Sequence, residues 1–247
     1  MTRSALRPAL LGIVLVVCVV AGVSAQRAGG PPAAPAQSGR AAAPEDLTGT
    51  WVSVVAEHWH LRMLVPPRGD VSMLPVNQTA RKIAATWDPA KEPVGDEQCR
   101  GYGAAAIMRI PGRLDIRWAG DNALRMDIDS GTQTRMFNFG GAAGEGQAPS
   151  WQGSSSARWV RGSLQVATTR MRPGYLRKNG VPYSDQARLE EYFDRFTEPN
   201  GDNWLVVDSI VTDPVYLTGP YLTSVAFKKI PDKQGWDPTP CRANEAR

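Results

Sequence analysis

Two short segments of this sequence carry residue types that could do chemistry. The first, Glu57-His58-Trp59-His60, holds both histidines of the chain. On a β-strand His58 and His60 would project from the same face, because side chains alternate along a strand. Two such imidazoles can share a metal ion, but no spacing selects a third ligand. We therefore expect no metal and no cofactor, and the two histidines either line a pocket or lie exposed on an edge strand.

The second segment, residues 175–180, places aromatic, cationic and amide groups beside a turn. Arg177 could bind a carboxylate bidentately, with Tyr175 or Tyr183 stacking on a ring or donating a hydrogen bond. In the alternative, the segment only makes a turn and Arg177 pairs with a local acid such as Asp185. The candidate ligand-binding residues are His58, His60, Arg62, Tyr175, Arg177 and Tyr183.

The elements that must position these residues are short strands. From residue 46 onward, apolar and polar residues alternate in runs bounded by Gly, Pro, Asn or Asp, a pattern typical of half-buried strands. We predict strands over residues 47–56, 58–65, 104–110, 113–119, 123–129, 132–139, 151–160, 163–170, 187–196, 203–212 and 221–229. Residues 78–87 alone predict a helix, with Asn77 as its N-cap.

A meander of this length must close or stack to hide its edge strands. We therefore predict an all-β fold, an antiparallel barrel of about 8 to 10 strands with one short helix. The domain opens on Leu47-Thr48-Gly49-Thr50-Trp51, which resembles the Gly-x-Trp signature of lipocalin-like (calycin) barrels. The resemblance implies a structural role for two residues: Gly49 permits a close backbone approach, and Trp51 fills the barrel floor.

Three longer strings resemble an uncharacterised family of secreted bacterial proteins. They are WQGxSxAxW at residues 151–159, YLRxNGxPYS at residues 175–184 and DPxYLTxP at residues 213–220. This resemblance implies kinship and no particular activity, because fold and kinship alone do not specify chemistry.

The N-terminal residues have the order of a signal peptide. A basic start is followed by an apolar run over residues 9–20 and by Val23-Ser24-Ala25, so we expect cleavage of residues 1–25. The apolar run is too short to span a bilayer, so no stable membrane anchor is expected. Residues 26–44 are rich in Ala, Pro and Gly and predict a disordered linker. Residues 45–247 then form a single β-barrel domain in a periplasmic or secreted protein.

Two cysteines, Cys99 and Cys241, remain after the predicted cleavage. In an oxidising compartment such a pair persists as a disulfide, which we predict here. The charge of the mature chain is nearly balanced, and no basic stripe interleaved with aromatic residues is present, so nucleic acid is an unexpected partner.

The sequence leaves three kinds of function open. The first is a lipocalin-like protein that holds a small apolar or amphipathic molecule in the barrel interior. The second is a cofactor-free hydrolase or isomerase with a His base and an Arg or Tyr that stabilises negative charge. The third is an envelope assembly or partner-binding protein with an exposed apolar face. The sequence lacks a nucleophile elbow, a phosphate loop and a dinucleotide fingerprint.

Overall fold

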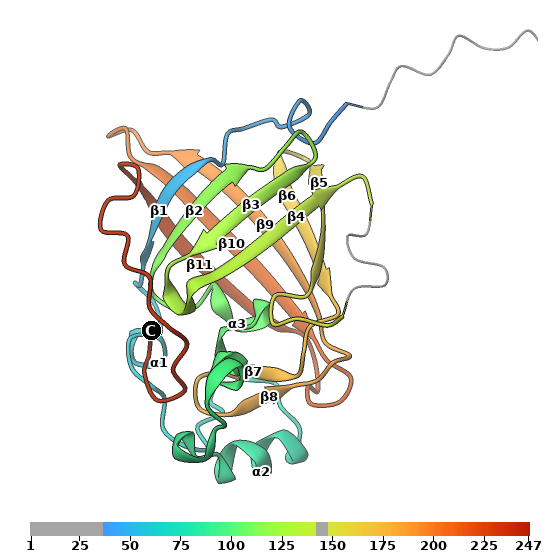
Figure 1. Ribbon diagram of the computed structural model, residues 1–247, viewed down its shortest axis with the longest axis vertical. Helices are drawn as coiled ribbons and strands as arrows, with labels where there is room; N and C mark the ends of the chain where they lie inside the picture. Colours follow the sequence, from blue (N-terminus) through green and yellow to red (C-terminus); the bar gives the residue numbers. More distant parts are fainter. Residues whose placement is uncertain (1–36, 142–147) are drawn as a thin grey trace, which may run out of the picture. The chain divides into compact units, whose positions relative to one another are not determined.

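A closed barrel dominates the computed structural model, which describes residues 37–141 and 148–247. Within these residues nine strands close in the order β1-β11-β10-β9-β6-β5-β4-β3-β2 (Figure 1). They are β1 (Gly49–Val54), β2 (Arg113–Trp118), β3 (Ala123–Ile128), β4 (Gln133–Phe139), β5 (Ser154–Val160), β6 (Ser163–Thr169), β9 (Arg188–Thr197), β10 (Asn203–Thr212) and β11 (Tyr221–Ile230). This architecture confirms the predicted all-β, lipocalin-like barrel.

Antiparallel pairing holds around the barrel with one exception in the described part of the chain. Strands β4 and β5 pair in parallel, with Phe137 opposite Ser155. The longest ladder joins β9 to β10 over ten residue pairs, from Asn203 opposite Thr197 to Thr212 opposite Arg188. The first and last strands, β1 and β11, also pair directly, which closes the barrel without a free edge.

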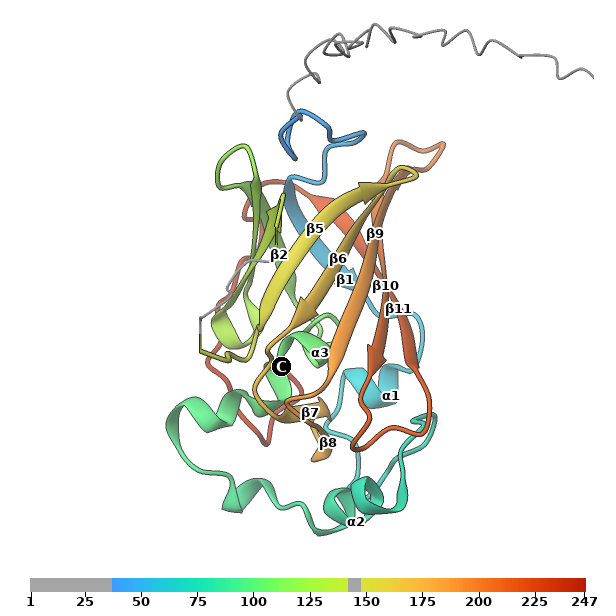
Figure 2. The ribbon, with the colours of Figure 1, turned by 90° about the vertical axis from the view of Figure 1, so that its right-hand side faces the viewer.

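One end of the barrel carries a set of short elements that we call the cap (Figures 1 and 2). The cap consists of residues 59–107 together with a two-stranded hairpin. Its elements are α1 (Trp59–Arg62), α2 (Gln78–Thr86), η1 (Pro89–Lys91), η2 (Gly95–Tyr102), α3 (Ala104–Ile107), β7 (Gly174–Arg177) and β8 (Val181–Tyr183). A further 3-10 turn, η3 (Ser130–Thr132), joins β3 to β4.

Two predicted strands of the cap are helical in the structure. Residues 58–65 contain α1 instead of a strand, and His58 begins it with a left-handed backbone, φ 49°. Residues 104–110 contain α3, which starts with three buried alanines. Alanine is the strongest helix former, which favours a helix at Ala104–Ala106. The prediction of a strand relied only on the apolar character of these residues. The prediction of one short helix is therefore wrong, and the hairpin β7–β8 was not predicted.

The predicted helix at residues 78–87 is confirmed as α2, and Asn77 caps it. The Asn77 Oδ1 accepts the Ala80 N–H at 3.0 Å, while Nδ2 donates to the Val215 carbonyl at 2.7 Å. We expect Asn77→Ala to lower the free energy of unfolding by about 1 to 2 kcal/mol in urea denaturation, because both bonds are lost. Asn77→Asp keeps the cap acceptor and should lose less. Equal losses in the two variants would contradict the capping role.

The barrel lumen is filled by its own side chains. Trp51, Phe137 and Phe193 are fully buried there, and the two phenyl rings lie 5.4 Å apart. The Trp51 indole donates to the Leu47 carbonyl at 3.0 Å. At the cap end, α3 contributes Ile107 to the same core. The lumen is thus a packed core. Side chains occupy the space in which we predicted a ligand.

One charged pair crosses this core. Arg135 of β4 and Glu191 of β9 have completely buried side chains and form two hydrogen bonds, of 2.9 and 2.5 Å. Arg135 also donates to the Thr168 hydroxyl at 3.3 Å, and Thr168 shares a hydrogen bond with Ser155 at 2.8 Å. The pair links strands that are not neighbours in the sheet.

Both chain ends of the described domain are held to the barrel or the cap. The predicted disulfide is confirmed: Cys99 in η2 is bonded to Cys241 near the C-terminus. Gly39 lies within the predicted linker, yet its carbonyl accepts the Trp159 indole N–H at 2.7 Å and its N–H donates to Asn122. Residues 37–44 of that linker therefore pack on the barrel. Its first part, residues 26–36, and the predicted signal peptide lie outside the described residues.

Among the residues that the structure describes, no helix has both the length and the apolar character needed to span a membrane.

Candidate functional site

A cavity of about 220 Å³ lies where the cap meets the rim of the barrel. We call it the cap cavity. The β1–α1 connection, the α3–β2 connection, the hairpin and β11 all contribute to its wall. Its lining residues are Glu57, His58, Met73, Arg109, Arg177, Tyr221, Leu222, Thr223 and Ser224.

Arg177 is the most unusual of these residues. It ends β7 and is only 5 % exposed, yet its Nε and Nη1 have no hydrogen-bond partner. The Nη2 of the half-buried Arg109 is also buried without a partner. A buried cation that lacks an acceptor costs stability, so such groups are rare unless something else accepts their hydrogen bonds. Two guanidinium groups with unused donors therefore line one cavity.

Tyr221 brings a third polar group to the same cavity. It is the first residue of β11, it is buried, and its hydroxyl lies beside the Arg177 guanidinium. Burial lowers the pKa of Arg177, an effect that the nearby Tyr221 and Asp70 oppose and that Arg109 reinforces. An anion placed between these side chains would meet donors from the hairpin, from the α3–β2 connection and from the barrel.

Arg62 has a different position from Arg177. Its completely buried side chain forms an ion pair with Glu57, and its Nε donates to the Arg109 carbonyl at 3.0 Å. Burial lowers the pKa of Arg62, and the Glu57 carboxylate opposes this. Arg62 thus holds the backbone of Arg109 in place and pairs its charge with Glu57, although its Nη2 is also buried without a hydrogen-bond partner. A small cavity of about 30 Å³, room for one water, lies among Arg62, Arg109 and Arg177.

The structure brings only part of the predicted site together. His58 and Arg177 line the cap cavity, and Arg62 lies behind it. His60 is exposed and lies edge-on to Trp59. The two histidines do not share a face, because the segment is a helical turn rather than a strand. Within the described residues no cluster of three His, Cys, Asp or Glu side chains could hold a metal ion.

The two predicted tyrosines lie elsewhere. The Tyr175 hydroxyl donates to Glu92 at 2.5 Å and accepts from Arg100. Tyr183 is almost fully buried beneath Gly103 and Gly174, where burial raises its pKa. Arg109 and Tyr221 replace them in the cavity. Sequence reasoning missed both, since each is a single polar residue in or beside an apolar run.

Lys178, the residue after Arg177, is a second buried cation. Its Nζ donates to the Tyr102 hydroxyl and lies 4.0 Å from the centre of the Tyr102 ring. Burial lowers the pKa of Lys178 to about 7. Lys178 also borders the small cavity beside Arg109 and Arg177. Among the described residues these three side chains form no ion pair with a carboxylate, whereas Arg62 pairs with Glu57.

This lowered pKa predicts a pH-dependent stability. An unfolded lysine has a pKa near 10.5, so between pH 7 and pH 10 the unfolded chain binds the extra proton and stability rises with pH. At pH 6 both states are protonated, and the folded state carries the full cost of the buried charge. We expect Lys178→Met to raise the free energy of unfolding at pH 6 by about 2 kcal/mol, after allowance for the lost hydrogen bond. Urea titrations at pH 6 and pH 10 measure this, and a gain of the same size at pH 10 would contradict it.

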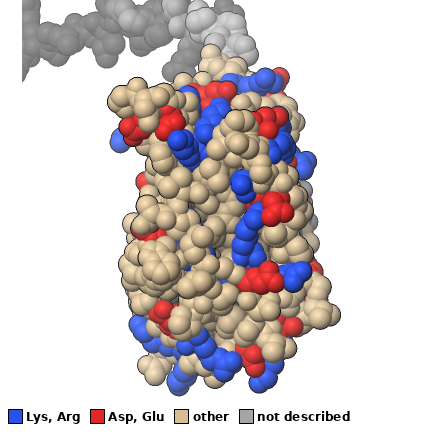
Figure 3. Space-filling model, turned by 90° about the vertical axis from the view of Figure 1, so that its left-hand side faces the viewer, with Lys and Arg blue, Asp and Glu red and all other residues tan. Residues whose placement is uncertain are grey.

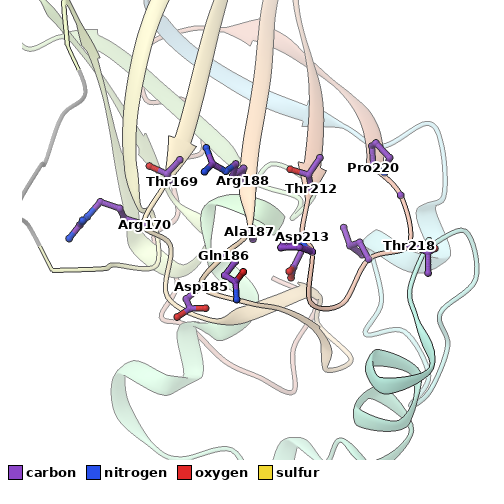
Figure 4. A pocket seen from close by; sticks show the side chains of 13 residues that line it. Thr169, Arg170, Asp185, Gln186, Ala187, Arg188, Thr212, Asp213, Thr218 and Pro220 are labelled. Carbon is purple, nitrogen blue, oxygen red and sulfur yellow. The ribbon is translucent and has the colours of Figure 1, made fainter.

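A second hollow, about 640 Å³, is an open groove at the ends of β6, β9 and β10. Its labelled polar side chains are spread along the groove instead of converging on one point (Figure 4). Its one buried carboxylate, Asp213, already accepts hydrogen bonds from the Ser184 N–H and hydroxyl and from the Val215 N–H. These bonds give Asp213 a structural role, so we place the candidate site at the cap cavity.

The sequence matches no protein-family model, and no curated protein is similar to it.

Proposed function

We propose that this protein binds a small amphipathic molecule through an acidic head group in the cap cavity. The unused donors of Arg177 and Arg109 are the observation that carries the proposal. A carboxylate offers two oxygens that a guanidinium binds bidentately, and such charge-assisted bonds are about twice as strong as neutral ones. The Tyr221 hydroxyl supplies a further donor on the same wall.

The apolar part of the ligand has a place beside the head group. Met73 and Leu222 line the cavity and are 63 % and 66 % exposed. A shallow hollow of about 440 Å³ on the outer face of β9 to β11 adjoins the cavity and shares Leu222, Thr223 and Ser224 with it. Ligand pockets for drug-sized molecules measure about 300 to 1,000 Å³, so the cavity alone fits a head group and the hollow extends it. The lumen, by contrast, is occupied by core side chains.

A location outside the cytoplasm accords with this function. The Cys99–Cys241 disulfide supports an oxidising compartment. Together with the predicted signal peptide, it favours a periplasmic or secreted carrier.

Arg177→Met tests the proposal with two ligands of equal chain length. Dodecanoate should bind the wild-type protein, and the variant should lose about 10-fold to 100-fold in affinity, because hydrogen bonds to a charged group are removed. Dodecanol, which has no charge, should bind both proteins with similar, weaker affinity. Calorimetric titration below the micellar concentration measures both. Arg188→Met, in the open groove, is the matched control and should bind dodecanoate normally.

The stability of the same variant supplies a second readout. Without ligand, Arg177→Met should raise the free energy of unfolding by about 1 to 3 kcal/mol, since the unsatisfied buried donors disappear. Weaker ligand binding together with higher stability is the result expected when a side chain serves binding at the expense of stability. Unchanged dodecanoate affinity in the variant would overturn the proposed function.

A second function, cofactor-free catalysis, has one observation in its favour. His58 lines the cap cavity together with Arg109, Arg177 and Tyr221, so a base and groups that stabilise negative charge face one space. His58→Gln should then leave dodecanoate affinity nearly unchanged but abolish the turnover of a dodecanoyl ester. Equal turnover in the variant would remove this candidate.

A further inference from the structure

Large apolar side chains are exposed around the mouth of the cap cavity. The described residues include nine exposed large hydrophobic side chains, of which five belong to α1, to the α1–α2 connection or to the start of β11. We call these five the apolar rim: Trp59, Met63, Leu64, Met73 and Leu222. Met73 and Leu222 border the cap cavity, and Leu64 borders the small cavity that shares Arg109 and Arg177 with it. Trp59 and Met63 lie one helical turn apart at α1, where the Met63 N–H donates to the Trp59 carbonyl.

The backbone at His58 sets this arrangement. His58 is in the left-handed region, φ 49°, which is unfavourable for a residue with a side chain and is found mainly where the surrounding structure requires it. With this turn, His58 lines the cavity while Trp59 is 59 % exposed. Tryptophan is highly buried on average in soluble proteins, and it is enriched in the interfacial belts of membrane proteins.

The cap also exposes basic residues. Residues 59–91, from α1 to η1, contain five basic and two acidic residues, of which Arg62 is buried and paired with Glu57, while Arg68 and Lys91 both pair with Asp88. Arg81 and Lys82 are exposed on α2. Several Lys and Arg side chains lie at the cap end of the face in Figure 3, together with a few Asp and Glu side chains and uncharged surface. Apolar side chains bordered by basic residues are complementary to an anionic lipid surface, where each nearby cation adds to the attraction.

From these features we infer that the apolar rim docks the protein on the surface of an anionic lipid bilayer. The inference rests on the proposed function, because an amphipathic ligand resides in such a bilayer and two rim residues, Met73 and Leu222, border the cavity that would receive its head group. Docking places Arg109 and Arg177 at the depth of the acidic head groups. The ligand can then pass from the bilayer into the cavity without crossing water.

Vesicle flotation of the full mature chain tests the inference. Vesicles of phosphatidylcholine alone are compared with vesicles that contain one quarter phosphatidylglycerol. The wild-type protein should float with the anionic vesicles, and the attraction should weaken in high salt. The double variant Trp59→Ser/Met63→Ser should lose at least about 10-fold in partitioning. Phe196→Ser, an exposed aromatic at the opposite end of β9 from the cap, is the matched control and should float like the wild type.

Solution binding of dodecanoate separates this inference from the proposed function. Neither Trp59 nor Met63 lines the cap cavity, so the double variant should bind monomeric dodecanoate as the wild type does. Flotation of the double variant equal to that of the wild type would overturn the docking inference and leave the binding function standing. So would failure of the wild type to float with anionic vesicles, and the rim would then fit a protein partner instead. If the wild type floats through the rim but does not bind dodecanoate, the proposed function fails and the docking surface remains.

Discussion

Replacing Glu191 with Leu is expected to lower the free energy of unfolding by about 3 to 5 kcal/mol. The change leaves Arg135 in the barrel lumen without its carboxylate, and both side chains of the pair are completely buried. The Thr168 hydroxyl, at 3.3 Å, is then the remaining hydrogen-bond acceptor for that guanidinium. Urea denaturation at pH 7 measures the loss.

The double variant Arg135→Met/Glu191→Leu separates the cost of an orphaned charge from the value of the pair. Replacing a buried ion pair with apolar residues of similar size is often neutral, because the desolvation penalty of both ions disappears. We expect the double variant to recover most of the stability that Glu191→Leu loses. Equal losses in the single and double variants would contradict this account, and would mean that the geometry of the pair itself stabilises the lumen.

The same pair shows how the sequence could predict the barrel. In β4 the alternation places Arg135 and Phe137 on one face, and in β9 it places Glu191 and Phe193 on one face. The period of two was visible for both strands, although each buried face includes a charge. Strands of this kind were predicted because the alternation is a local property of the chain.

The cap could not be predicted in the same way. Its segments are short, and residues 104–108 are apolar throughout, a pattern that fits a buried helix as well as a strand. Only α2 was identified, because Asn77 and the apolar face give a local signal for a helix start. The elements that carry most of the candidate site therefore lay in the part of the chain with the weakest local pattern.

The residues of the candidate site also differ in whether the local sequence could predict them. Arg177 and His58 were predicted because each lies in a segment with several polar groups. Arg109 and Tyr221 are isolated in sequence and meet Arg177 only after the barrel closes and the hairpin packs beneath it. The unused donors of Arg109 and Arg177, which mark the candidate site, are a property of the tertiary structure alone.

Removing the disulfide is the second change with a large expected effect. We expect Cys99→Ser/Cys241→Ser to lower the free energy of unfolding by about 3 to 5 kcal/mol. The two cysteines are 142 residues apart, so the bond closes a long loop and restricts the unfolded chain strongly. Urea denaturation of the double variant, compared with the oxidised wild type, measures the difference. Wild-type protein unfolded in the presence of a reductant should give the same value.

The alternative is that the bond only fixes the C-terminal segment to η2. Tyr102 accepts the Arg242 N–H at 3.1 Å and Gln98 accepts the Ala243 N–H at 2.9 Å, so the segment has attachments besides the disulfide. If the segment merely frayed without the bond, the loss in stability would stay below about 1 kcal/mol, the value of a hydrogen bond or two. Such a small loss, together with faster hydrogen exchange confined to residues 241–247, would contradict a global role. A loss of the expected size, spread over the barrel amides, would show that the bond acts on the whole domain by restricting the unfolded chain.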